Sequence, residues 1–115
     1  MADLLDPAEL PSGFIYPPEF LRVVELGLVN VEPWWIFDGV ALRDRTVGLR
    51  DRFPDRVLVP FARREDNDDV ACWEQQPPQV VVIHDFASPG FENRGAFADF
   101  YDWLRQAIED LIAFG

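Results

Sequence analysis

Residues 57–85 read VLVPFARREDNDDVACWEQQPPQVVVIHD, and this stretch decides the fold. It contains three apolar runs separated by two polar clusters rich in Asp, Asn, Gln and Pro, residue types that favour turns. Short apolar runs rich in valine and aromatic residues, bounded by such turns, are typical of β-strands. The stretch therefore predicts a β-meander with strands near 57–62, 70–74 and 80–85.

Two features predict where these strands lie in the sheet. Val80–Ile83 is apolar without alternation, which indicates burial on both faces and a central position. Pro60 has no N–H to donate to a strand ladder. We therefore expect the first strand to lie at an edge, or to carry Pro60 at a position that needs no donor.

Helices are predicted on both sides of the meander. Pro17-Pro18 opens one near 18–26, and Gly27 follows where a left-handed C-terminal residue is common. Between 40 and 53, charged residues interleave with apolar residues in a weakly amphipathic pattern, which favours a second helix there. The clearest helix is predicted near 96–113, where one apolar stripe lies opposite charged residues. Its members are Phe97, Phe100, Leu104, Ala107, Ile108, Leu111 and Ile112.

Two shorter elements precede these. Asp6-Pro7 favours a short helical turn within 3–10, and the aromatic segment Pro33–Phe37 predicts a strand. A chain of 115 residues has room for one domain, 1–115, with one core. We therefore expect an α+β fold: a single compact domain whose antiparallel β-meander sheet has flanking helices at the N-terminus, in the middle and at the C-terminus.

The composition predicts a folded cytoplasmic protein. Hydrophobic residues make up 49% of the chain and aromatic residues 14%, which is far more apolar matter than a disordered chain carries. No apolar run is long enough for a membrane span, and the start at Met1 has no signal-like segment. The single cysteine, Cys72, excludes an internal disulfide and fits a reducing compartment.

The charge of the chain predicts the kind of partner. There are 21 carboxylates against 10 basic residues, all arginine, so the formal net charge is -11. Nucleic acid is an unfavourable partner, because contacts to phosphate would form against this repulsion. A basic protein is the natural complement, and the field would speed its encounter with the chain. The alternative is that the acidity serves solubility alone.

No metal or cofactor is predicted. With one histidine and one cysteine, the chain lacks the ligands of a zinc site. The segment Asp66-Asn67-Asp68-Asp69 is similar to a calcium loop, but an EF-hand that began at Asp66 would require glycine at Ala71 and glutamate at Pro77. We therefore interpret this segment as a solvated turn with Asx-type hydrogen bonds that joins two strands.

Cys72 and His84 are the one candidate catalytic pair. If Glu74 lies opposite Val80, then His84 lies on the same face as Cys72, one diagonal step away. A slip of one residue in register places them on opposite faces. A thiol in apolar surroundings is usually an inert packing group. We therefore predict no catalytic residue, and keep a small thiol enzyme that uses Cys72 and His84 as an alternative.

Several segments, in their order and spacing, carry a resemblance to a known family. They are Val59–Arg64, Asp66–Trp73 and Val82–Gly90, with Tyr16–Leu21 and Pro33–Phe37 upstream and Phe97–Leu104 downstream. In these segments the chain resembles the SUKH superfamily, which groups bacterial toxin-immunity proteins with a fungal regulator of cell-wall synthesis. The resemblance implies an α+β domain with helices packed on the sheet. For the bacterial members it implies binding of a toxin domain, often a nuclease or a deaminase.

We therefore expect a non-enzymatic protein-binding domain, with an immunity protein that neutralises a basic toxin as the leading hypothesis. The alternative is a regulatory or scaffold module, similar to the fungal branch, that has no toxin partner. Because adjacent residues of a strand point to opposite faces, one of Trp34 and Trp35 is expected to be an exposed anchor. The oligomeric state stays open. The other residues predicted to bind the partner are Glu65, Asp66, Asp68, Asp69 and Glu74.

Overall fold

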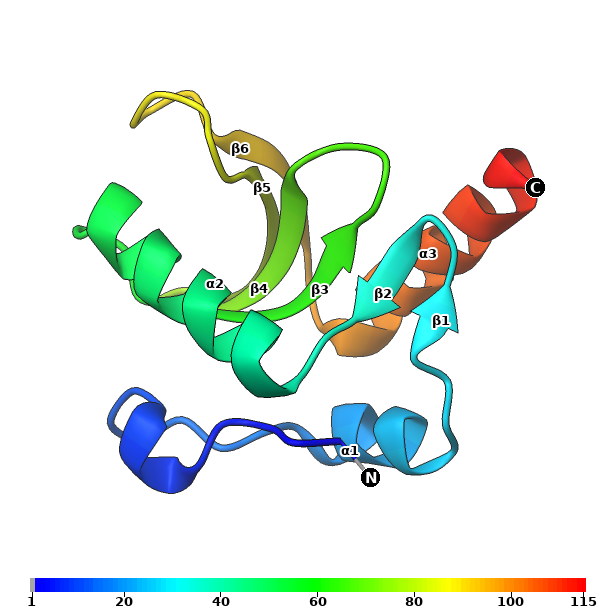
Figure 1. The fold of residues 1–115 in the computed structure, drawn as a ribbon, viewed down its shortest axis with the longest axis horizontal. Helices are drawn as coiled ribbons and strands as arrows, with labels where there is room; N and C mark the ends of the chain where they lie inside the picture. The colour runs from blue at the N-terminus through cyan, green and yellow to red at the C-terminus, as the bar shows by residue number, and fades with distance from the viewer. Residues whose placement is uncertain (1) are drawn as a thin grey trace.

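Six antiparallel strands form one sheet in which the spatial order follows the sequence, β1-β2-β3-β4-β5-β6 (Figure 1). The computed structural model describes residues 2–115. This topology confirms the predicted meander. The strands are β1 (Asn30–Val31), β2 (Trp34–Ile36), β3 (Leu58–Arg64), β4 (Asp69–Gln75), β5 (Pro78–His84) and β6 (Asn93–Phe97).

Three α-helices cover the two faces of this sheet. They are α1 (Pro18–Glu25), α2 (Gly39–Arg52) and α3 (Phe100–Phe114), and a 3-10 helix precedes them (Pro7–Glu9). One core cluster joins α1 and α3 to one face of the sheet, and a second joins α2 to the other. The sheet is thus the middle layer of an α+β domain, as the sequence predicts.

The period-two pattern of β4 explains why there are two cores. Ala71 and Trp73 face α1 and α3, whereas Val70 and Cys72 face α2. Around Trp73 the first core is aromatic, with ring centroids 4.4 Å from Phe61 and 4.8 Å from Phe20. Such pairs stabilise a core by about 0.5–1.5 kcal/mol each beyond the area they bury.

A buried ion pair holds α2 to the end of β5. The side chain of Asp85 is 0% exposed, and its Oδ1 lies 2.6 Å from Arg52 Nε. Its second oxygen accepts from Arg52 Nη2 at 2.8 Å and lies 3.2 Å from Arg45 Nη1. The two arginines compensate a carboxylate that would otherwise be costly to bury.

The predicted position of Pro60 is only partly correct. β3 lies between β2 and β4 and is not an edge strand. However, β2 pairs only with residues 62–64, so β3 has a neighbouring strand on one side alone at Pro60. The ladder to β4 also shifts its register between Pro60 and Ala62. The proline is therefore accommodated where pairing is incomplete.

β5, by contrast, lies between β4 and β6 and is buried over Val80–Ile83, as predicted.

The sequence missed both edge strands and placed the start of the last helix too early. Residues 93–97 form β6, and α3 begins only at Phe100. Asp99 is the N-cap of α3, and its side chain accepts the N–H of Asp102 at 2.8 Å. β6 was missed because it is largely exposed and lacks the apolar run that marks a strand, and β1 was missed because it has only two residues.

No helix within residues 2–115 combines the length and the apolar character that crossing a bilayer requires.

Candidate functional site

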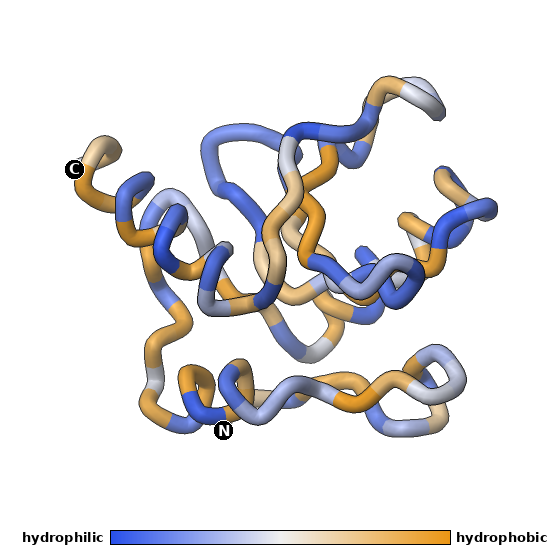
Figure 2. Tube along the Cα trace, turned by 180° about the vertical axis from the view of Figure 1, so that it is seen from behind, coloured by the Kyte–Doolittle hydropathy of each residue, from blue (hydrophilic) through white to orange (hydrophobic). Residues whose placement is uncertain are grey.

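The β3–β4 turn presents most of the predicted binding carboxylates. We call residues 65–68 the hairpin tip; Glu65, Asp66 and Asp68 are exposed there. Figure 2 shows the loop as a continuous hydrophilic segment between hydrophobic strands. The N–H of Asp69 donates to Asn67 Oδ1 at 2.8 Å. This Asx turn between two strands confirms the interpretation of the acidic segment as a turn.

The hairpin tip is fixed to its neighbours. The backbone N–H of Glu65 donates to the carbonyl of Pro33 at 2.8 Å, which joins the tip to the β1–β2 turn. Asp66 pairs with Arg64 at 2.7 Å, and the carbonyl of Asp68 accepts the N–H of Asp85 at 3.1 Å. The acidic surface is therefore preorganised, which lowers the ordering cost of binding.

The two adjacent tryptophans point to opposite faces, as predicted for a strand. Trp34 is 4% exposed and lies in the core, and its Nε1 donates to Asp110 Oδ2 at 2.8 Å. Trp35 is half-buried, and its Nε1 donates to Glu65 Oε2 at 2.8 Å. Of the two, only Trp35 is accessible to a partner, and it lies directly beside the hairpin tip.

Asp69 and Glu74 are engaged in ion pairs. The side chain of Asp69 is 13% exposed and contacts His84 Nδ1 at 3.2 Å and Arg94 Nε at 3.5 Å. Glu74 is 14% exposed and pairs with Arg56 at 2.9 Å. Five residues along β4 separate the two, about 17 Å at the usual rise of a strand. The structure therefore leaves Glu74 away from the hairpin tip.

Sequence reasoning missed two carboxylates in segments that lie next to the hairpin. Glu32 lies in the β1–β2 turn next to Pro33, and Asp110 of α3 lies 3.6 Å from Arg64 Nη1. No local pattern marks them, because only the tertiary fold brings these segments to the hairpin. Because Asp110 lies with Trp34 on the α3 side of the sheet, opposite Trp35, it is left out of the set that we call the hairpin surface: Glu32, Trp35, Glu65, Asp66 and Asp68.

Cys72 and His84 do not form a pair. The observed register places Cys72 opposite Val81 and His84 opposite Asp69, so the two side chains lie on opposite faces of the sheet. The register that would have paired them is wrong because Gln75 pairs with Pro78, which leaves only Gln76 and Pro77 in the turn. Cys72 is fully buried against α2, and this burial raises the pKa of its thiol.

Comparisons with family models, curated proteins and solved structures find no match to this chain. The function is therefore inferred from the geometry of the surface.

Proposed function

We propose that this protein is a non-enzymatic binding domain that acts as an immunity protein. It neutralises a basic toxin domain, such as a nuclease or a deaminase, by stoichiometric contact through the hairpin surface. The observation that carries this proposal is the group of exposed carboxylates Glu65, Asp66 and Asp68 beside the accessible Trp35.

The chemistry of the surface supports a basic protein as the partner. A nuclease displays arginine and lysine where the phosphates of its substrate bind, so carboxylates on a rigid turn compete for those residues. The net charge of -11 increases the rate of encounter. Trp35 supplies the apolar contact area that a cluster of charges lacks, and tryptophan is enriched among residues that dominate binding energy.

The test is a titration against the C-terminal domain of a toxin encoded beside this gene. We expect a one-to-one complex that weakens as the salt concentration rises, and protection of cells that express the toxin. Absence of both a complex and protection would contradict the proposal. Binding to a host protein instead of the toxin would favour the regulatory module that the sequence left as an alternative.

A variant pair locates the contact. Replacing Glu65, Asp66 and Asp68 by their amides should weaken the complex by about tenfold or more, because each lost ion pair at an interface rim contributes up to about 1 kcal/mol. The matched control replaces Glu25, Asp44 and Asp51, which are exposed elsewhere on the chain. An equal loss in the control would show that net charge alone, and not the hairpin surface, governs binding.

A further inference from the structure

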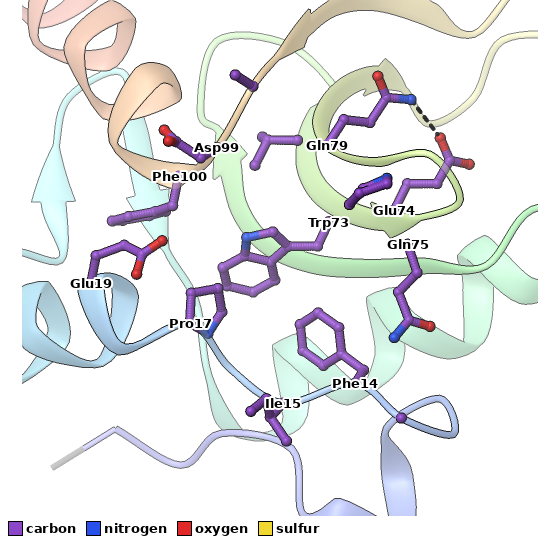
Figure 3. A pocket seen from close by; sticks show the side chains of 14 residues that line it. Phe14, Ile15, Pro17, Glu19, Trp73, Glu74, Gln75, Gln79, Asp99 and Phe100 are labelled. Atoms are coloured by element: carbon purple, nitrogen blue, oxygen red, sulfur yellow. Dashed lines mark hydrogen bonds between the residues drawn. The ribbon is translucent and has the colours of Figure 1, made fainter.

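A pocket of about 350 Å³ lies at the end of β4 that is remote from the hairpin tip. It is formed by the chain before α1, the β4–β5 hairpin and the start of α3 (Figure 3). Phe14, Pro17, Trp73 and Phe100 supply its apolar lining. The polar residues that line it are Glu19, Glu74, Gln75, Gln79 and Asp99.

The indole of Trp73 leaves a hydrogen-bond donor unused in this pocket. Trp73 is 6% exposed, and its Nε1 has no acceptor within residues 2–115. A buried tryptophan N–H usually has a partner, and leaving one unpaired costs about 1–3 kcal/mol. In Figure 3 the nitrogen lies on the side of the ring toward Asp99 and Phe100. The nitrogen itself is closed to solvent, so an oxygen that enters the pocket accepts this hydrogen bond only after the side chains around the ring shift.

The charge of the pocket selects a cation. Glu19 and Asp99 lie on the same side of the pocket, next to Phe100 (Figure 3). Within the described residues neither carboxylate is paired with an arginine. Glu74 is different, because Arg56 already compensates it at 2.9 Å. Among residues 2–115, Glu19 has no such partner, and Asp99 is engaged only as the N-cap of α3. Two carboxylates without an arginine beside aromatic rings disfavour an anion and favour a planar guanidinium, which both pairs with carboxylates and packs on aromatic faces.

We propose that this pocket receives an arginine side chain from the basic protein partner. The guanidinium pairs with Glu19 and Asp99, and a backbone carbonyl of the same segment accepts the N–H of Trp73. A peptide fits better than a bare cation, because it combines the positive charge with an acceptor oxygen. The inference rests on the proposed function, in that it takes the partner to be a basic protein, and it adds a second contact remote from the hairpin surface.

The pocket can be tested without the toxin. A short blocked peptide with a central arginine is titrated into the protein labelled with nitrogen-15, and the indole N–H signals of the four tryptophans are followed. We expect a saturable shift of the Trp73 signal in the millimolar range, with little change at Trp34 and Trp35. The same peptide with citrulline, which is neutral and similar in shape, should not saturate. Guanidinium chloride should bind more weakly than the arginine peptide.

Variants establish which carboxylates are responsible. Glu19→Gln combined with Asp99→Asn should weaken binding of the arginine peptide by about fivefold, as expected for the loss of two partly exposed ion pairs. Asparagine at 99 keeps an oxygen for the N-cap of α3, and a dispersed spectrum shows that the variant is folded. The control, Asp44→Asn with Asp51→Asn on α2, should bind as the native protein does.

Three results would overturn the proposal: no saturable shift at Trp73, equal binding of the citrulline peptide, or an equal loss in the control. Equal binding of guanidinium would overturn the part assigned to the carbonyl. Because the hairpin variants are tested against a toxin and the pocket variants against a peptide, failure of one proposal can be told from failure of the other.

Discussion

At the scale of single residues, the charged side chains serve two different purposes. Glu65, Asp66 and Asp68 lie in water at the hairpin tip, whereas Asp85 is enclosed between Arg45 and Arg52. A partner can reach only the first group. Asp85 and its two arginines hold α2 against the end of β5, although nothing in the sequence around Asp85 distinguishes it from the other carboxylates.

Asp85→Ala is expected to lower the free energy of unfolding by about 3–5 kcal/mol, because it leaves two partly buried arginines without a counter-charge. Urea denaturation followed by tryptophan fluorescence measures this change. Asp51→Ala, on the exposed side of the same helix, should change the free energy by less than about 0.5 kcal/mol. Similar values for the two variants would show that the buried pair contributes nothing particular to stability.

At the scale of elements, boundaries depend on caps more than on apolar periodicity. The stripe from Phe97 to Ile112 is continuous, but the backbone changes from strand to helix within it, at Asp99. Phe97 packs on the first core from a strand and Phe100 lies in that core from a helix. The N-cap hydrogen bond to Asp102 therefore fixes where α3 begins.

Asp99→Ala should lower the free energy of unfolding by about 1 kcal/mol, whereas Asp99→Asn, which keeps a capping oxygen, should lower it by only a few tenths of a kcal/mol. Thermal denaturation of both variants followed by circular dichroism gives the comparison. If the Asp99→Ala and Asp99→Asn variants proved equally stable, the cap would not be what sets the start of α3.

At the scale of the whole molecule, Arg56 connects three separate segments. It pairs with Glu74 of β4 and with Glu92 of the β5–β6 loop, each at 2.9 Å, and donates to Asn93 at 2.8 Å. Burial by itself would raise the pKa of the Glu92 carboxyl, but hydrogen bonds from backbone N–H groups and from Arg56 lower that pKa below its ordinary value of 4.5. The folded state therefore favours the charged form of Glu92 more than the unfolded state does.

A carboxyl with a lowered pKa contributes stability above its unfolded pKa and loses that contribution as the pH falls through its folded pKa. Between pH 6 and about pH 3, the native protein should therefore lose more unfolding free energy than Glu92→Gln does. Urea denaturation at the two pH values measures both losses, with Glu109→Gln, an exposed position on α3, as the control. An equal loss in the native protein and in Glu92→Gln would contradict the expectation.

The sequence by itself determined the meander, the three helices and the acidic turn, because apolar periodicity and turn chemistry are local properties. It also established that Trp34 and Trp35 point to opposite faces, since a strand has a period of two. Which of them is buried, and the register that separates Cys72 from His84, were decided only by the tertiary structure. For Trp34 the physical reason is that burial depends on a partner distant in the chain, since α3 covers it. The register of β4 against β5 depends on how short the turn at Gln76-Pro77 is, and the run of turn-forming residues 75–79 does not mark where each strand ends.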